Sequence, residues 1–306
     1  MAIPTRVLGR TGAEVTVLGY GAMELRGPPR GPAIDDAEAG RLLNELLDAG
    51  INLIDTSVDY GRSEELIGRY VSGRRDEYFL ASKCGCPLSP PPDATPPYKH
   101  DYSAANVRAD VEQSLQRLQT DRLDLVQVHM SPSVEEMDRG GTLEELVRLR
   151  DEGKLRFIGM SGILPNLPDH IDMGVFDVFQ IPYSALQREH EELISRAASA
   201  GAGVLVRGGA ARGTAAGDKA WSVQPLSLSD QAPVRDLWEA ADLDALLDGM
   251  SRHEFILRFT LSHPALSSTI VGTSNPSHLR SNVEIAQRGP LPEDLYAEAR
   301  RRLAAA

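Results

Sequence analysis

The chain has 306 residues, a hydrophobic content of 42% and a formal net charge of −12 at pH 7. This length suits either two ordinary domains or one barrel-type domain, and the apolar content is enough for a sizeable core. The acidic charge argues against nucleic acid as a partner, because binding to phosphates favours a basic face.

The first predicted element is a β-hairpin in "TRVLGRTGAEVTVLG" (5–19), with its turn at R-T-G-A. Eight short apolar runs follow from this point onward, and they have the pattern of parallel strands that are covered on both faces. The runs are "TVLGYGAM" (16–23), "INLIDTS" (51–57), "YFLASKC" (78–84), "LDLVQVHM" (123–130), "LRFIGMSG" (155–162), "FDVFQIPYS" (176–184), "GVLVRGGA" (203–210) and "STIVGTS" (268–274).

Helix patterns lie between these runs. The first, 35–50, has acidic residues in its first turn and Gly50 at its end, and the second, 63–73, has Ser63 as its expected N-cap. The others are expected at 103–119, 142–153, 189–201 and 277–289, with two helical pieces in 242–263 and a last helix at 292–303.

Eight strand–helix units predict an α/β protein of the (β/α)8 TIM-barrel type, as a single domain over residues 1–306. The N-terminal β-hairpin is expected to close the far end of the barrel, and the extra C-terminal helix to pack outside. The alternative is a doubly wound open sheet. That fold favours a G-x-G-x-x-G turn after the first strand, whereas this chain has "GYGAME" there, which lacks the third glycine.

Cysteine usage indicates a reducing compartment. Cys84 and Cys86 are the only two cysteines, they are too close for an ordinary disulfide framework, and without nearby ligands they make a poor zinc site. The N-terminus lacks the pattern of a secretory signal, and no apolar run of about 18 residues is present to span a membrane. We therefore expect a cytoplasmic protein with neither membrane nor metal as a partner.

Four ionisable residues lie at or just after the ends of consecutive predicted strands. Asp55 ends the second run and Tyr60 follows in its loop, while Lys83 and His129 end the third and fourth runs. Each alone also suits a capping, packing or structural role. Barrel enzymes carry reactive groups at the carboxyl ends of their strands, and this end of the barrel is called the mouth here. These four side chains are therefore expected to meet at the mouth.

The chemistry of such a group is proton delivery. A lysine ammonium favours the phenolate form and lowers the pKa of a nearby tyrosine, while an aspartate would hold the lysine in place. A histidine with a proton on Nε2 would donate a hydrogen bond to a substrate oxygen. The set therefore predicts protonation of a carbonyl oxygen, with an external hydride donor and without a metal cluster.

These segments resemble the aldo-keto reductase family over almost the whole chain. The similarity runs from "VLGRTGAEVTVLGYGAM" through the D-T-x-x-x-Y-G motif of "INLIDTSVDYG", "ASKCG", "LDLVQVHMS", "GKLRFIGMSG" and "FDVFQIPYSAL" to "TIVGTSNPSHLRSN". The resemblance implies a (β/α)8 barrel, metal-free NAD(P)H-dependent carbonyl reduction, and Tyr60 as the proton donor of a catalytic tetrad. That tetrad consists of Asp55, Tyr60, Lys83 and His129.

The resemblance also implies a cofactor site that departs from the family pattern. Ser161 and Gln180 match residues that hold the nicotinamide carboxamide, but Gly162 replaces the usual asparagine and Arg207 replaces the usual stacking aromatic ring. The remaining cofactor positions are Gly208, Ala210, Gly272, Thr273, Ser274, His278 and Asn282. His278 replaces an arginine and Gly272 a lysine that read the 2′-phosphate, and Arg280 is close enough in sequence to compensate. NADP(H) is favoured over NAD(H).

The substrate is expected to be a small carbonyl compound. Its pocket is expected to be lined by Met23, Glu24, Met130 and Tyr183, and to be covered by two long loops at 87–102 and 208–234. Two alternatives are an NAD-dependent sugar or alcohol dehydrogenase, and a cofactor-sensing regulatory protein with little turnover. These residues do not determine the physiological substrate, the reaction direction or the oligomeric state.

Overall fold

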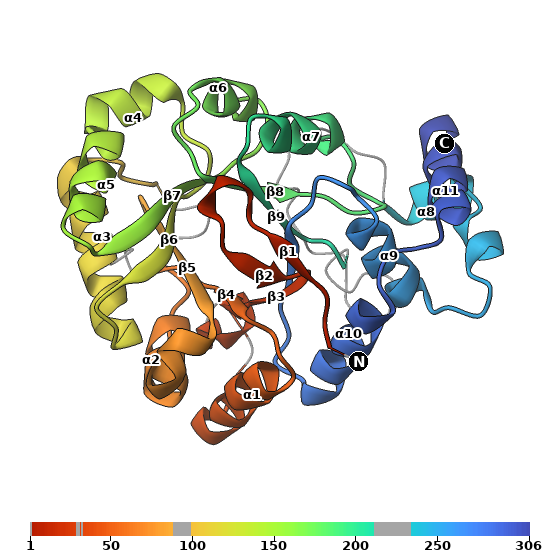
Figure 1. Cartoon of the computed structure of the whole chain (residues 1–306), viewed down its shortest axis with the longest axis horizontal. Coiled ribbons are helices and arrows are strands. Elements are labelled where there is room, and N and C mark those ends of the chain that lie inside the picture. Colours follow the sequence, from red (N-terminus) through yellow and green to blue (C-terminus); the bar gives the residue numbers. More distant parts are fainter. Residues whose placement is uncertain (1, 29–30, 32, 88–98, 211–233) are drawn as a thin grey trace.

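The computed structural model describes all residues except 1, 29–30, 32, 88–98 and 211–233, and it forms a closed barrel of eight parallel strands (Figure 1). In chain order the strands are β3 (Leu18–Gly21), β4 (Leu53–Asp55), β5 (Phe79–Cys84), β6 (Leu123–Val128), β7 (Leu155–Ser161), β8 (Val178–Pro182), β9 (Gly203–Arg207) and β10 (Ser268–Val271). Strand β10 pairs with both β9 and β3, which closes the sheet. The barrel prediction is confirmed, and the open doubly wound sheet is excluded.

Helices surround the barrel (Figure 1). They are α1 (Asp36–Asp48), α2 (Ser63–Val71), α3 (Ala104–Leu118), α4 (Val134–Gly140), α5 (Thr142–Asp151), α6 (Leu167–Asp172), α7 (Glu191–Ser199), α8 (Val234–Ala240), α9 (Arg252–Leu261), α10 (Pro276–Arg288) and α11 (Glu293–Ala305). Short 3-10 helices are η1 (Gly9–Thr11), η2 (Ala22–Arg26), η3 (Ser72–Glu77) and η5 (Leu243–Leu246). Every helix predicted from the sequence is present, whereas the short α4, α6 and α8 were not predicted.

The start of α2 differs from the prediction. Arg62 occupies the N-cap position and Ser63 is the first helical residue. The Ser63 hydroxyl instead donates to the carbonyl oxygen of Ala22 at 2.9 Å and lies 2.9 Å from the hydroxyl of Thr56. It thus ties the helix to the segments after β3 and β4, because a buried hydroxyl favours partners in the surrounding structure.

The predicted hairpin is present and closes the amino-terminal end of the barrel. Strands β1 (Thr5–Val7) and β2 (Glu14–Thr16) are antiparallel, and Gly12 in the turn has a φ of 67°. Leu8 and Val15 are fully buried in the inner apolar cluster together with barrel residues such as Leu53. The hairpin therefore acts as a plug that seals this end with apolar side chains.

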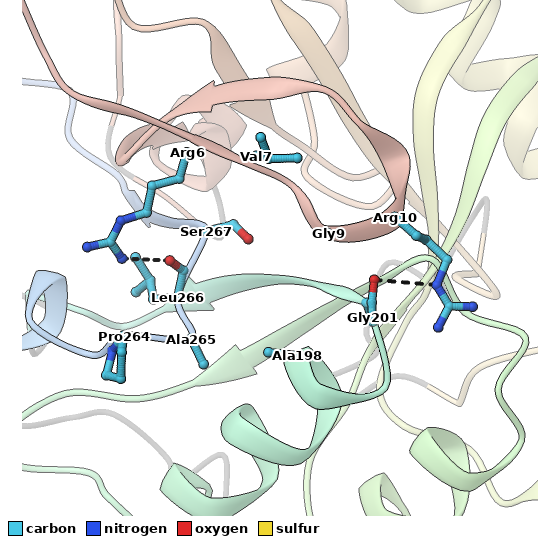
Figure 2. A pocket seen from close by; sticks show the side chains of 11 residues that line it. Arg6, Val7, Gly9, Arg10, Ala198, Gly201, Pro264, Ala265, Leu266 and Ser267 are labelled. Atoms are coloured by element: carbon cyan, nitrogen blue, oxygen red, sulfur yellow. Dashed lines mark hydrogen bonds between the residues drawn. The ribbon is translucent and has the colours of Figure 1, made fainter.

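A cavity of about 580 Å³ lies beneath this hairpin (Figure 2). Arg6 donates to the carbonyl oxygen of Leu266 at 2.7 Å, and Arg10 donates to that of Gly201 at 3.4 Å. Both arginines thus anchor the hairpin to the barrel at the end opposite the predicted functional residues.

The inside of the barrel changes from apolar to polar along four of the strands, β4, β5, β6 and β8. Side chains alternate between the two faces of a strand, so residues two apart face the same way. Leu53, Ala81, Leu125 and Val178 all belong to the inner apolar cluster. Two residues after them come Asp55, Lys83, Gln127 and Gln180, all buried. The fold thus places a polar layer on top of an apolar one, at the mouth.

Candidate active site

A buried ion pair lies at the centre of the polar layer. Lys83 Nζ is 2.7 Å from Asp55 Oδ2, and the two side chains are only 1% and 2% exposed. The ammonium also donates to the backbone carbonyl oxygen of Thr56 at 2.7 Å. Since β4 and β5 are neighbouring strands, the barrel itself brings the two charges together. A buried charge is costly unless it is paired and hydrogen-bonded, and both conditions are met here.

Two amides complete the surroundings of the carboxylate. Gln127 and Gln180 each donate from Nε2 to Asp55 Oδ1 at 2.8 Å, and Gln180 also donates to Gln127 Oε1 at 3.0 Å. Gln127 was not predicted as a site residue. The available signal was its spacing, because it follows the inner Leu125 by two residues as Asp55 follows Leu53.

The loop after β4 carries Tyr60 over this pair. Lys83 Nζ lies 4.8 Å from the centroid of the Tyr60 ring. Gly61 follows with a φ of +48°, and a Cβ there would lie 2.2 Å from the backbone oxygen of Arg26. A glycine is therefore required directly after the tyrosine, both for the left-handed backbone and for the close approach of the neighbouring chain.

His129 completes the group on the other side of Tyr60. It directly follows β6, and its backbone N–H donates to the carbonyl oxygen of Cys84 at 3.0 Å. The centroids of the His129 and Tyr60 rings are 6.3 Å apart, with 77° between the ring planes. The four side chains predicted to meet at the mouth are therefore neighbours in the structure.

Burial dominates the electrostatics of these groups. It raises the pKa of Tyr60, and Lys83 lowers this pKa as expected but offsets the effect of burial only in part. Burial lowers the pKa of His129 to about 3, which leaves its imidazole neutral near pH 7. For Lys83 burial alone lowers the pKa, but Asp55 and Tyr60 outweigh burial and the pKa is raised. The mouth thus combines a protonated phenol, a neutral imidazole and a charged ammonium.

The cysteines have neighbours that the sequence did not reveal. Cys86 Sγ lies 3.2 Å from His129 Nδ1, and ligand atoms of Cys86, His100 and His129 all lie within 4.8 Å of one another. The expectation that the cysteines lack nearby ligands was therefore wrong, because these three side chains could hold a metal ion. His100 is distant in sequence from both partners and has no motif around it, so only the fold reveals the cluster.

The residues predicted for the nicotinamide end lie on adjacent strands. Ser161 and Gln180 pair across β7 and β8, and both are buried. A Cβ at Gly162 would lie 2.8 Å from the side chain of Leu167, so the packing of α6 leaves little room for the usual asparagine. Arg207 ends β9 and is half-buried.

Backbone rather than side chains forms the next part of the predicted cofactor path. Gly208 has a φ of +74°, and Ala210 is buried. A Cβ at Gly272 would lie 2.6 Å from the backbone oxygen of Gly21, so a lysine does not fit there without a backbone shift. Close approach of the main chain suits a phosphate path.

Some of the polar groups at the start of α10 already have hydrogen-bond partners within the protein. The buried Thr273 hydroxyl accepts from the backbone N–H of Asn275, the N-cap of the helix, at 3.0 Å. Asn282 Oδ1 lies 2.7 Å from His253 Nε2 on α9. Asn275 and His253 were not predicted, and they position this segment. Ser274 is half-buried at the same turn.

The two basic residues considered for a 2′-phosphate differ in their surroundings. His278 is exposed on the first turns of α10. Arg280 forms an ion pair with Glu45 on α1 at 2.6 Å. The structure thus directs the arginine toward α1.

Not all of the predicted pocket residues lie at the mouth. Met23 and Glu24 are half-buried on η2, and Met130 is 37% exposed beside His129. Tyr183 does not line the mouth, and that prediction was wrong. Its buried ring belongs to the outer core, and its hydroxyl lies 3.3 Å from both Glu191 on α7 and the Tyr296 hydroxyl on α11. Strand alternation explains this, because Gln180 on β8 faces inward and residue 183 therefore faces the helices.

Two further predictions concern the long loops over the mouth, 87–102 and 208–234. Most of both loops, 88–98 and 211–233, lies outside the described residues. Among the described residues, no helix is both long enough and apolar enough to cross a membrane.

Comparisons with known proteins agree with this geometry. Residues 17–302 match the model of the aldo/keto reductase family. The chain is 30% identical to L-galactose dehydrogenase of Arabidopsis thaliana, over 92% of this chain and 87% of that protein. An aldo-keto reductase of Bacillus halodurans in its holo form aligns with a TM-score of 0.82 at 28% identity, covering 99% and 97% of the two chains. Glycerol dehydrogenase of Gluconobacter oxydans aligns with a TM-score of 0.80 at 27% identity, covering 100% and 96%.

Proposed function

The chain belongs to the aldo/keto reductase family of oxidoreductases, and on this basis we propose that it reduces an aldehyde or ketone to an alcohol with NAD(P)H. Tyr60 is the proposed proton donor. The observation that carries the proposal is the buried Asp55–Lys83 pair with its ammonium 4.8 Å from the centroid of the Tyr60 ring. An arrangement of this kind supports proton transfer to an oxygen that becomes negative.

The chemistry that a bound NAD(P)H would supply is the hydride for the carbonyl carbon of the substrate. As negative charge develops on the carbonyl oxygen, Tyr60 gives up its phenolic proton and a new O–H bond completes the alcohol. Lys83 stabilises the phenolate that is left, and Asp55 keeps Lys83 in place. Because His129 is neutral and its Nδ1 faces Cys86, the Nε2 proton is available to hold the substrate oxygen.

The residues at the remaining mouth positions fit a dinucleotide. Glycines at 208 and 272 let the backbone approach closely, and α10 is a 13-residue helix whose N-terminus suits a phosphate. Ser161 and Gln180 would hold the carboxamide, with Arg207 beside the nicotinamide ring. The other proposed contacts are Gly208, Ala210, Gly272, Thr273, Ser274, His278 and Asn282.

NADP(H) is the first choice of cofactor, because His278 is exposed near the start of α10 and is basic. A second candidate function is that of an NAD-dependent sugar or alcohol dehydrogenase. The Arg280–Glu45 ion pair favours this second function, because the pair keeps the arginine away from a 2′-phosphate. The lack of room for a lysine side chain at Gly272 favours it too. The names L-galactose dehydrogenase and glycerol dehydrogenase among the relatives favour only its sugar or alcohol substrate. Fluorescence titration with NADH and NADPH separates the two, and tighter binding of NADH favours the second.

The substrate we propose is a small carbonyl compound that contacts Met23, Glu24 and Met130 at the mouth. The thiols of Cys84 and Cys86 are both free, which suits the proposed cytoplasmic location. Residues 1–306 are proposed to form one domain.

Replacing Tyr60 by phenylalanine tests the function. A panel of aldehydes and ketones is assayed with both cofactors, and Tyr60→Phe is expected to lower kcat/KM by about 10²-fold or more while cofactor binding is kept. Tyr78→Phe is the matched control, because that hydroxyl donates to the carbonyl oxygen of Val71 before β5, at the amino-terminal end of the barrel. Wild-type rates in Tyr60→Phe would refute the proton-donor role. Tight cofactor binding without turnover of any carbonyl would favour the regulatory alternative instead.

A further inference from the structure

We propose that Cys86, His100 and His129 form a zinc-binding site at the barrel mouth, and that zinc bound there inhibits the enzyme. One ligand atom from each residue lies within 4.8 Å of the others, and Cys86 Sγ is 3.2 Å from His129 Nδ1. The centroids of the His100 and His129 rings are 5.5 Å apart. The three donors come from the ends of two neighbouring strands and from a segment that precedes α3.

The donor set favours zinc over the hard cations. A thiolate with two imidazoles suits Zn²⁺, whereas Mg²⁺ and Ca²⁺ prefer oxygen ligands. Zinc bonds of about 2.3 Å to sulfur and about 2.0 Å to nitrogen, at tetrahedral angles, place ligand atoms roughly 3.5 Å apart. Cys86 Sγ and His129 Nδ1 are already within this spacing, and a pair at the upper bound of 4.8 Å would have to close by about 1.3 Å. Three protein ligands leave the fourth position of the tetrahedron for water.

Neighbouring residues already hold the first ligand, Cys86, in place. Asp110 Oδ2 accepts from the backbone N–H of Gly85 at 2.7 Å and from that of Cys86 at 3.1 Å. Asn106 donates to the backbone carbonyl oxygen of Cys86 at 3.1 Å. Such supporting bonds restrict the motion of a ligand and so reduce the entropy lost when a metal binds.

Tyr102 supports the other two ligands. Its hydroxyl donates to the backbone carbonyl oxygen of His129 at 2.8 Å, and its ring stacks on that of His100 with centroids 5.9 Å apart. Gly85 makes room for this ring, because a Cβ at that position would lie 2.6 Å from it. One buried aromatic residue therefore holds the backbone of His129 and the ring of His100 beside Cys86.

The inhibitory effect follows from the position of the cluster and rests on the proposed function. Zinc displaces the thiol proton of Cys86, which leaves to solvent, and adds positive charge beside Tyr60, whose ring centroid is 6.3 Å from that of His129. His129 is the residue proposed to hold the substrate oxygen, so a metal bound to its ring acts directly on the proposed catalytic group. Zinc also holds the ring of His129 in one position.

Cobalt titration tests the site without any assay of activity. The full chain is treated with EDTA, desalted and titrated with Co²⁺ while absorption is recorded. We expect one Co²⁺ per chain, a thiolate-to-cobalt charge-transfer band and the intense visible bands of four-coordinate cobalt. Cys86→Ser should lose the charge-transfer band, and His100→Ala should weaken binding at least about tenfold. The matched control Cys84→Ala removes the other thiol and should keep the band.

The absence of a thiolate band in the wild-type protein, or its persistence in Cys86→Ser, would overturn the site, and neither result depends on turnover. Inhibition is measured as the activity with Zn²⁺ relative to that of the same variant in EDTA. We expect reversible inhibition of the wild-type enzyme, and at least about tenfold more Zn²⁺ for the same inhibition of Cys86→Ser. A cobalt band without zinc inhibition would overturn the inhibitory role. A cobalt band in a protein without carbonyl turnover would support the site and count against the proposed function.

Discussion

Replacing Asp55 by asparagine removes the negative charge beside a fully buried ammonium. Lys83 would keep only neutral hydrogen-bond acceptors, the carbonyl oxygen of Thr56 at 2.7 Å from its Nζ and at most the amide oxygen of the new asparagine. Removing one partner of a buried ion pair costs about 3–5 kcal/mol, because the other charge remains without compensation. At roughly 2 °C per kcal/mol for a chain of this size, the melting temperature should fall by about 6–10 °C.

Replacing the other partner, Lys83, is expected to lower the free energy of unfolding by less. In Lys83→Met the carboxylate of Asp55 keeps two amide donors at 2.8 Å, from Gln127 and Gln180. Each hydrogen bond to a charged group contributes about 1.5–3 kcal/mol, so this variant should lie at the lower end of the range, near 3 kcal/mol. The double variant removes both charges, and its loss should be smaller than the sum of the two single losses by about 2–3 kcal/mol.

Urea denaturation of the wild type, the two single variants and the double variant measures this cycle. A coupling energy below about 0.5 kcal/mol would refute the view that the pair is mutually dependent. A larger loss for Lys83→Met than for Asp55→Asn would refute the role assigned to the two glutamines.

Three further outcomes are expected. Gly61→Ala should lower the free energy of unfolding by about 1–3 kcal/mol in urea denaturation, because its Cβ would lie 2.2 Å from the backbone oxygen of Arg26; an unchanged value would contradict this. Burial lowers the pKa of His190 below 6.5, so its stabilising contribution is present above about pH 6.5 and is lost as the pH falls. Between about pH 7 and pH 5, wild type should therefore lose up to about 1.4 kcal/mol per pH unit more than His190→Gln, and equal slopes would contradict it. Glu45→Ala frees Arg280 and should raise the affinity for NADPH relative to NADH by about two- to tenfold in fluorescence titration, whereas an unchanged ratio would show that the arginine does not reach the cofactor.

Local patterns in the sequence were enough for the elements and their order. Apolar runs predicted all eight strands, and Asp35 caps α1 by accepting from two backbone N–H groups, as acidic residues at a helix start suggest. The positions of Asp55, Tyr60, Lys83 and His129 at strand ends also followed from the chain, because a barrel brings the carboxyl ends of consecutive strands to one place.

The sequence could not show which side of a strand faces the barrel interior when both sides are apolar. Ile181 and Tyr183 on and after β8 face the helices, while Gln180 faces inward, although all three are buried. Nothing in the local pattern separates them, since both faces of a parallel strand are covered. For this reason Tyr183 was wrongly predicted to line the pocket.

What the sequence by itself determined is therefore the barrel class, the order of its elements and the four ionisable residues at the mouth, since these depend on spacing along the chain. Only the tertiary structure decided that Gln127 bonds Asp55, that Arg280 pairs with Glu45, and that Cys86 and two histidines converge. Glu45 and Arg280 are 235 residues apart, and Asp55 and Gln127 are 72 apart. Contacts over such separations arise from strand register and barrel closure, which bring side chains together without leaving a local signal in the sequence.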